Sequence, residues 1–164
     1  MALRNIREDG DPILRKKCRP VTEFNERLFE LLDDMAETMY EAPGVGLAGP
    51  QVGVMRRVCI VLDQYIDEEG NEVDEIIEFV NPEILEKSEE TITSFEGCLS
   101  FPGRNGLITR PAYVRAKAQD RTGEWFEIEA EGILARAICH ENDHLNGITV
   151  LDNANLFYED MTPE

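Results

Sequence analysis

The sequence predicts one α+β domain, in which mixed or antiparallel β-sheets pack around a central helix that carries an HExxH pattern. The 164 residues are one domain's worth of chain. A second, amphipathic helix is predicted near the N-terminus, and several short β-type runs lie between the two helices. We expect the domain to span residues 1–164, with a core over about 4–151 and a tail over 152–164.

The first elements are marked by capping residues and by helical periodicity. Asp11 and Pro12 are typical of the start of a short helical turn, with aspartate as the cap and proline at the first position. Over about 23–41, apolar residues recur at three- and four-residue spacing, which predicts an amphipathic helix ended by Pro43 and Gly44. The four glycines and the proline of 44–53 predict a loop without a regular element. The apolar residues of the helix are Leu28, Leu31, Leu32, Met35 and Met39.

The rest of the chain predicts five strands, a second helix and a tail. The β-type runs cover 58–62, 76–80, 91–95, 113–118 and 125–128, and the acidic stretch 67–72 indicates an exposed hairpin turn or loop. A helix follows over about 132–145 and ends at Asn146 and Gly147. We expect the polar tail from 151 to 164 to be loosely packed or frayed.

Charge and cysteine content exclude several classes of partner. Sixteen basic and 34 acidic residues give a formal net charge of −18, which repels nucleic-acid phosphates and anionic lipids. We therefore expect no direct nucleic-acid binding and no membrane contact, and the absence of an apolar span or signal core favours a cytoplasmic protein. The four cysteines lack CxxC spacing, so free thiols or a metal site are favoured over two disulfides, which stay open as an alternative.

The most informative pattern is the pair of histidines in the second helix. His140 and His144 are the chain's two histidines, and Glu141 lies between them. Four helical residues bring the two imidazoles within about 40° of one another on one face, so both can reach one cation. Glu141 is then placed to act as a base on a metal-activated water. The alternative is that both histidines are ordinary surface residues of the helix.

A catalytic metal site needs a third protein ligand, and the sequence leaves a carboxylate or a cysteine open. The segment 96–100 offers the best local candidate, Cys98, because it follows a predicted strand and has Gly97 beside it. Taken alone, such a cysteine is more often a buried structural residue. Together with the histidine pair, however, Cys98 is more readily interpreted as a metal ligand than as a structural residue.

The glycine loop has a second interpretation. From Gly44 it matches G-x-G-x-x-G, but it follows a helix rather than a strand and runs into Pro50, so we reject a nucleotide site. Such a loop instead permits close approach of an extended peptide or a small substrate. Gln51 at its end can donate a hydrogen bond to a developing oxyanion.

Three segments, 44–51, 96–100 and 140–144, resemble in order and spacing the three signature motifs of the peptide deformylase family. The resemblance extends to 11–15, to Asn81-Pro82 and to Arg110-Pro111, and covers about 4–151. It implies a metal-dependent hydrolase that removes the formyl group from the N-terminal formyl-methionine of nascent polypeptides and releases formate.

The resemblance also implies a role for each residue that matches a motif. Cys98, His140 and His144 would bind one divalent metal per chain, with Fe²⁺ the expected ion and Zn²⁺, Ni²⁺ or Co²⁺ as substitutes. Glu141 would take a proton from water and pass it to the leaving amine. The amide of Gln51 and the backbone N–H of Leu99 would stabilise the oxyanion. The expected substrate-binding residues are Gly44, Val45, Gly46, Glu96 and Gly97, of which the first three would border the methionine pocket and pair with the peptide as an added strand.

Two positions depart from the commonest family pattern. Gly49 stands where the family most often has alanine, and Cys139 stands where glutamine usually precedes the first histidine. We expect Cys139 to pack against the sheet rather than compete for the metal. The partners implied are formyl-methionyl peptides and nascent chains; we expect a monomer, and the short tail gives no support for ribosome docking.

Two other functions stay open at this point. A zinc peptidase shares HExxH but usually takes its third ligand from downstream of the helix, where Glu159 is the one glutamate before the terminal residue. A binding protein that has kept the fold and lost turnover is the other alternative. Turnover of a formyl-methionyl peptide, compared with cleavage of internal peptide bonds, separates the three.

Overall fold

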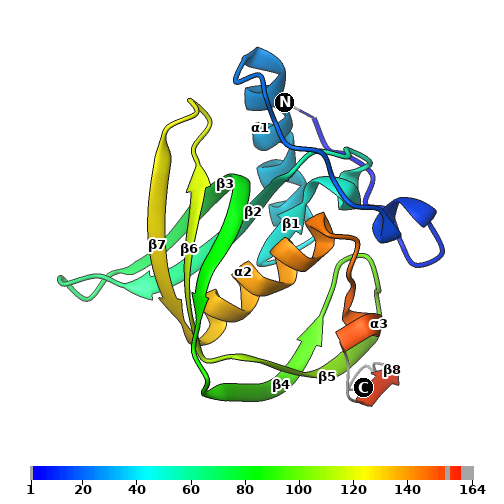
Figure 1. The fold of residues 1–164 in the computed structure, drawn as a ribbon, viewed down its shortest axis with the longest axis vertical. Coiled ribbons are helices and arrows are strands. Elements are labelled where there is room, and N and C mark those ends of the chain that lie inside the picture. The colour runs from blue at the N-terminus through cyan, green and yellow to red at the C-terminus, as the bar shows by residue number, and fades with distance from the viewer. Residues whose placement is uncertain (1, 154–155, 160–164) are drawn as a thin grey trace.

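Two antiparallel sheets and two longer helices make up the computed structural model of the chain, which describes residues 2–153 and 156–159 (Figure 1). The predicted α+β class is confirmed, and the neighbouring strands of both sheets pair antiparallel. The larger sheet has the order β1 (Gly46–Ala48), β2 (Val58–Ile66), β3 (Glu72–Lys87), β6 (Tyr113–Gln119) and β7 (Trp125–Glu131). The smaller sheet has the order β4 (Thr91–Gly97), β5 (Arg104–Pro111) and β8 (Leu156–Glu159).

Helix α1 (Glu26–Glu41) covers one face of the larger sheet. It begins later than predicted, because the side chain of Asn25 caps it by accepting a hydrogen bond from Leu28 N at 3.3 Å. The apolar residues predicted for this helix are buried against side chains of β1, β2 and β3. Ahead of it, the short 3₁₀ helix η1 (Pro12–Arg15) has Asp11 as its cap, as predicted.

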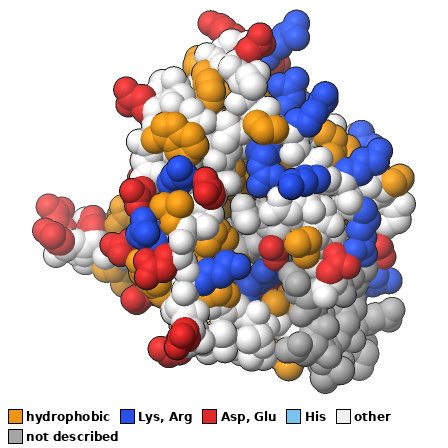
Figure 2. All heavy atoms as spheres, viewed as in Figure 1, with side chains coloured by type: hydrophobic (Ala, Val, Ile, Leu, Met, Phe, Trp, Pro, Cys, Tyr) orange, Lys and Arg blue, Asp and Glu red, His pale blue; other side chains and the backbone are white. Residues whose placement is uncertain are grey.

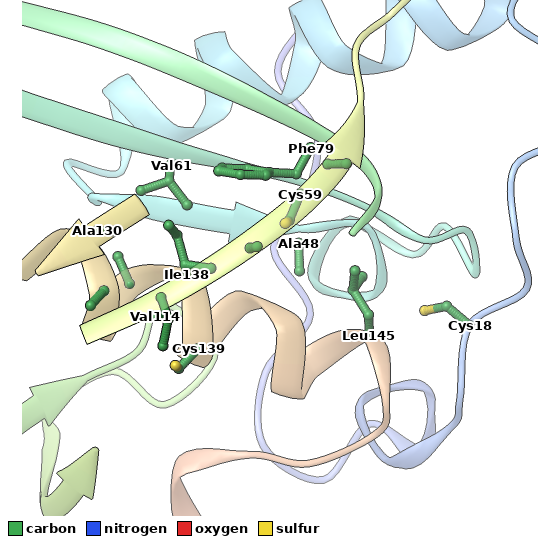
Figure 3. Close-up of a cluster of buried hydrophobic side chains, with 14 residues drawn as sticks. Cys18, Ala48, Cys59, Val61, Phe79, Val114, Ala130, Ile138, Cys139 and Leu145 are labelled. Carbon is green, nitrogen blue, oxygen red and sulfur yellow. The ribbon is translucent and has the colours of Figure 1, made fainter. Parts of the chain in front are cut away.

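Helix α2 (Gly132–Leu145) lies on the other face of the larger sheet and also contacts β5 of the smaller one (Figure 1). It has the predicted bounds. The core between α2 and the larger sheet consists mainly of small and branched side chains, such as Val61, Val114 and Ile138 (Figure 3). Cys139 packs in this cluster, as expected, together with Cys59. All four cysteines lie among the described residues, and all are free thiols.

The glycine loop contains more regular structure than predicted. Residues 46–48 form β1, whose central residue Leu47 lies opposite Ile60 of β2, and 49–52 form a second 3₁₀ helix, η2 (Gly49–Val52). The expectation of an irregular loop is therefore wrong for 46–52. Glycine and proline lower strand and helix propensity locally, but pairing with β2 supplies the hydrogen bonds that the local sequence does not favour.

Two strands differ from their predictions for identifiable reasons. Strand β3 runs well beyond 76–80, and its register shifts near Asn81, which has φ +51° and is held by hydrogen bonds to Val21 and Gln119. Strand β5 was missed because its buried side carries Gly106 and Arg110, so no apolar alternation marks it.

The predicted tail contains two ordered elements. After the short helix α3 (Val150–Asn153), β8 pairs with β5 from Arg104 to Leu107, so the expectation of a frayed tail is wrong for 156–159. Residues 154–155 and 160–164 lie outside the described part of the chain. No helix among the described residues is long and apolar enough to cross a membrane.

Candidate active site

Three side chains that could hold a metal ion converge between α2 and the end of β4. His140 and His144 lie one helical turn apart, and Cys98 directly follows Gly97, the last residue of β4. Nε2 of His144 lies 3.2 Å from Nε2 of His140 and 3.3 Å from Sγ of Cys98. One ligand atom from each side chain lies within 4.8 Å of the other two. The structure thus brings together the three residues for which the sequence predicted a metal.

The chemistry of this group fits a bound cation. Imidazole nitrogens and a thiolate present lone pairs to one point, where they repel one another unless a proton or a metal ion lies between them. Burial lowers the pKa of His140, but Glu141, Cys98 and Glu96 outweigh burial and raise that pKa well above its ordinary value. Burial, with the neighbouring His140, lowers the pKa of His144 well below its ordinary value. The site therefore favours one positive charge beside a neutral imidazole that can act as a ligand.

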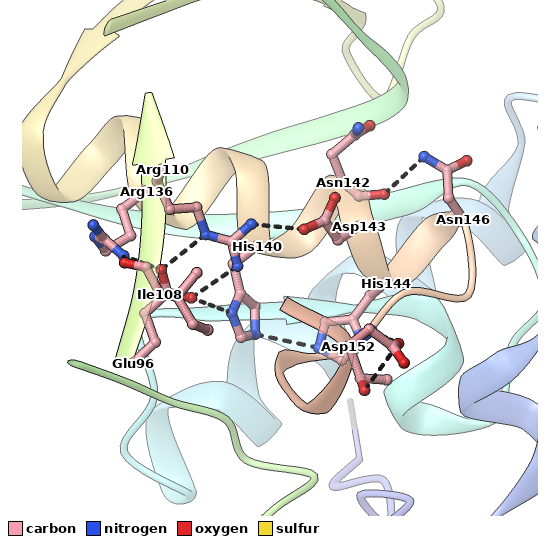
Figure 4. Close-up of polar contacts among 11 residues, drawn as sticks. Glu96, Ile108, Arg110, Arg136, His140, Asn142, Asp143, His144, Asn146 and Asp152 are labelled. Carbon is pink, nitrogen blue, oxygen red and sulfur yellow. Dashed lines mark hydrogen bonds and ion pairs between the residues drawn. The ribbon is translucent and has the colours of Figure 1, made fainter. Parts of the chain in front are cut away.

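Glu96 orients His140 by contacting the ring nitrogen that does not face His144 (Figure 4). Its Oε1 lies 3.0 Å from Nδ1 of His140, so a neutral His140 donates from Nδ1 and directs the lone pair of Nε2 into the site. Arg110 donates two hydrogen bonds to the same carboxylate, at 2.8 and 2.9 Å, and Arg136 donates another. Burial alone would raise the pKa of Glu96, but the hydrogen bonds from Arg110 and His140 hold it well below its ordinary value. Glu96 is therefore an ionised acceptor for His140.

Glu141 lies buried beside this group, with Oε1 lacking a hydrogen-bond partner among the described residues. Burial is the main cause that raises its pKa to about 7. Gly46 of β1 lies so close that a Cβ there would run into the Glu141 carboxylate. A buried carboxylate of this kind suits a group that takes up and releases a proton near neutral pH.

Gln51 is held by hydrogen bonds beside Cys98. Oε1 of Gln51 accepts from Ala48 N at 2.9 Å, which turns Nε2 toward Oγ of Ser100 at 3.1 Å and Sγ of Cys98 at 3.5 Å. Leu99 follows Cys98, and its side chain packs against Gly44, where a Cβ would lie 2.7 Å from Cδ1 of Leu99. Gln51 is therefore a pre-positioned donor beside the thiol.

A cavity of about 770 Å³ lies beside this group, and His140 and Cys98 line it. The predicted substrate-binding residues all line this cavity: Gly44, Val45, Gly46, Glu96 and Gly97. Gln51, Leu99 and Glu141 line it as well, and Val45 at its rim is 49% exposed. The carboxylate of Glu96, however, is engaged by His140 and the two arginines.

Four residues of the site were given no role from the sequence, although Ser100, Arg110 and Asp143 lie in segments that carry the family resemblance. Ser100 accepts a hydrogen bond from Gln51, and Asp143 accepts one from Arg110 at 2.6 Å. Arg136 also donates to the backbone oxygens of Ile108 and Ile92, at 3.1 and 2.6 Å. Arg136 lies four residues before His140 and therefore on the same face of the helix. This spacing could have indicated from the sequence that Arg136 belongs to the site. No local pattern gave Arg110 a role, because its partners come from β4 and α2.

Comparison with known proteins gives one consistent match. The model of the polypeptide deformylase family matches residues 3–159. A peptide deformylase of Clostridium botulinum (strain Alaska E43 / Type E3) is 53% identical over 152 residues, which cover 93% of this chain and 97% of that protein. A peptide deformylase of Caldicellulosiruptor bescii is 54% identical over 157 residues, covering 96% of this chain and 89% of that protein.

Solved structures agree with the sequence relatives. The crystal structure of peptide deformylase from Thermotoga maritima has a TM-score of 0.82 and 43% identity, covering 94% of this chain and 99% of that one. The Met-Ala-Ser-bound structure of a class I type b peptide deformylase from Acinetobacter baumannii has a TM-score of 0.84 and 36% identity. The match covers 92% of this chain and 98% of the Acinetobacter baumannii chain.

Proposed function

The chain belongs to the polypeptide deformylase family, and on that premise we propose that Cys98, His140 and His144 hold its catalytic divalent metal. Enzymes of this family remove the N-terminal formyl group from nascent polypeptides, and this chain is a hydrolase of that kind. The observation that carries the assignment is the convergence of one thiol and two imidazoles, within 4.8 Å, beside the cavity.

A divalent metal held there would activate water for attack and polarise the formyl oxygen as a Lewis acid. Glu141 takes the proton from the attacking water and passes it to the amine that leaves. Its buried carboxylate suits this exchange, because burial raises its pKa to about 7 and so makes it a stronger base than an exposed glutamate.

Gln51 and Leu99 stabilise the oxyanion that forms at the formyl carbon. Nε2 of Gln51 is held by the bond of its Oε1 to Ala48 N, so the donor needs little reorganisation when charge develops. The backbone N–H of Leu99, next to Cys98, is the second donor. Removal of one such donor costs about 10²–10³-fold in kcat in other hydrolases.

The peptide binds along Gly44, Val45 and Gly46. Strand β1, which starts at Gly46, is an edge strand of the larger sheet, so an extended peptide can add to its free side. Glu96 and Gly97 contribute to the wall across the cavity. The Met-Ala-Ser peptide in the related Acinetobacter baumannii structure supports a peptide as the occupant.

The proposal also includes the native metal, the extent of the domain, the oligomeric state and the location of the protein. We take Fe²⁺ as the native metal, with Zn²⁺, Ni²⁺ or Co²⁺ as substitutes, because a thiolate with two imidazoles suits all of these ions. We also keep the expectations of a single catalytic domain over 1–164, a monomer and a cytoplasmic location.

Formate release from formyl-Met-Ala-Ser, on protein purified without oxygen and with its metal content measured on the same sample, tests the proposal. We expect turnover with about one metal per chain. Cys98→Ala should lose metal and turnover together, whereas the matched variant Cys139→Ala, which alters a buried thiol in the core cluster, should keep both.

Glu141→Gln tests the base separately from the ligands. It should keep its metal and lose about 10²–10⁴-fold in kcat. Full activity in Glu141→Gln would exclude its role as base, and metal without formate in the parent protein would favour the peptidase or the non-catalytic relative.

A further inference from the structure

The chain carries a strongly basic patch, although its net charge is −18. No acidic residue occurs in 12–22 or in 42–62, and these two segments hold six of the sixteen basic residues. The remaining chain therefore has ten basic and 34 acidic residues, a balance of −24 against +6 for the two segments. The six residues of this basic patch are Arg15, Lys16, Lys17, Arg19, Arg56 and Arg57.

The fold joins the two segments into one surface. Arg19 and Arg56 form an isolated β-bridge, in which Arg19 N donates to Met55 O at 3.2 Å and Arg57 N donates to Arg19 O at 2.9 Å. The patch is thus created by tertiary contact between segments almost forty positions apart. Figure 2 shows Lys and Arg side chains gathered on the right of the molecule, where the N-terminal segment runs, whereas Asp and Glu gather at the left around the β2–β3 hairpin.

The backbone under the patch is rigidly anchored. Leu14, Cys18 and Val21 are buried, and Cys18 N donates to Leu145 O at 2.9 Å at the end of α2. The guanidinium of Arg57 also donates to Leu145 O, at 3.1 Å. A ligand would therefore meet a backbone that is already in place, and binding would order the side chains rather than the chain.

Four of the six cations are available for a partner. Lys16, Lys17, Arg19 and Arg56 are exposed. None of these four appears in the ion pairs formed within the described residues, where Arg15 pairs with Asp152. Among the described residues, the exposed large apolar side chains lie outside 12–22, and the one in 42–62, Val45, lines the cavity instead. The patch therefore offers charge rather than an apolar anchor. A surface that inserts into a membrane usually combines both, so an RNA backbone is the better match.

We propose that this basic patch binds the phosphate backbone of RNA, a function that goes beyond the deformylase site. At physiological salt the Debye length is about 8 Å, so an RNA on the patch is screened from the acidic residues around the β2–β3 hairpin, on the opposite side of the molecule (Figure 2). Net charge alone predicts that nucleic acid is repelled. That prediction does not take into account that the basic residues are concentrated in this patch.

The patch and the cavity lie toward opposite ends of α2. The patch contacts the C-terminal end of α2, at Leu145, whereas Gly132 and Ile133 at the other end line the cavity. A helix of 14 residues is about 21 Å long, so RNA on the patch leaves the cavity open to a peptide.

The test is fluorescence anisotropy with a labelled RNA duplex of about 20 base pairs over a range of salt concentrations. Four available cations predict a slope of log affinity against log salt of about −3 to −4. Lys16→Glu/Lys17→Glu should weaken binding at low salt by about tenfold or more. The matched control Arg27→Glu/Lys87→Glu makes the same change of −4 in net charge at two exposed residues outside the patch and should alter affinity by less than about twofold.

The outcomes separate this proposal from the catalytic one. Both double variants should deformylate formyl-Met-Ala-Ser at the parental rate, because neither changes the site. Absence of RNA binding by the parent at low salt, or equal weakening in the two variants, overturns the proposal. Binding to phosphatidylserine vesicles without binding to RNA also overturns it, and would make the patch a membrane contact.

Discussion

Glu96 Oε1 lies 3.0 Å from Nδ1 of His140, and the same carboxylate receives hydrogen bonds from Arg110 and Arg136 (Figure 4). Three donors from β5 and α2 thus meet on one side chain of β4. The arrangement ties the orientation of an imidazole that we propose as a metal ligand to the contact between the smaller sheet and the helix. Glu96 is therefore a positioning residue, and its effect on the reaction passes through His140.

Glu96→Gln should lower the affinity for the metal by about 10- to 100-fold, because an amide is a weaker acceptor for His140 and leaves the arginines facing a neutral group. Competition with a chelator measures this affinity. Glu90→Gln is the control, since Glu90 is exposed just before β4. Equal metal affinity in the two variants would show that Glu96 does not position His140.

Gly46→Ala should reduce kcat strongly while the protein remains folded. The added methyl group would run into the carboxylate of Glu141, which must move or lose its orientation. Formate release, metal content and a melting curve on one sample distinguish this effect from loss of metal or of fold. Unchanged kcat would mean that the exact position of Glu141 does not matter.

Gly49→Ala should destabilise the protein by about 1–3 kcal/mol, although alanine is the commoner residue in the family at this position. In this chain a Cβ at Gly49 would lie 2.7 Å from Val54 O and 2.8 Å from Arg56 O, and backbone atoms cannot rotate away. Urea unfolding measures the change. A gain of about 0.4–1 kcal/mol, the usual result where alanine fits, would contradict the contact.

Asp34 should make stability depend on pH in a defined direction. Burial alone would raise the pKa of this buried carboxyl, but hydrogen bonds from Ala2 N at 2.7 Å and Arg4 Nε at 3.0 Å outweigh it, so the pKa lies below its ordinary value. A lowered folded-state pKa stabilises the protein above the unfolded pKa of about 4, and this contribution is lost as pH falls below it. Asp34→Asn should therefore cost about 1.5–3 kcal/mol at pH 7 and progressively less in acid.

The control for this prediction lies on the same helix. Glu30 is exposed, so Glu30→Gln should change the free energy of unfolding little at either pH. Urea unfolding at neutral and at acid pH gives both comparisons. A cost of Asp34→Asn that does not diminish in acid would show that the charge of Asp34 is not what stabilises the protein.

Local patterns in the sequence predicted the elements whose signal is local. The bounds of α2 and the cap of η1 depend on neighbouring residues, and both are confirmed. Strand β1, by contrast, exists because β2 supplies hydrogen bonds to a glycine-rich segment, and β5 has an arginine on its buried side. Pairing and ion-pair formation between distant segments override local propensity at these places.

The same division applies to the function. By itself the sequence determined the α+β class, the family resemblance and the identity of the three candidate ligands, because residue type and helical spacing decide which atoms can meet a metal. Only the tertiary structure decided that Glu96 serves His140 rather than facing the cavity alone, and that six basic residues form one surface on an acidic protein. The Glu96–His140 contact and the basic patch both depend on which distant segments the fold brings together. Neither the periodicity of the sequence nor its net charge contains this information.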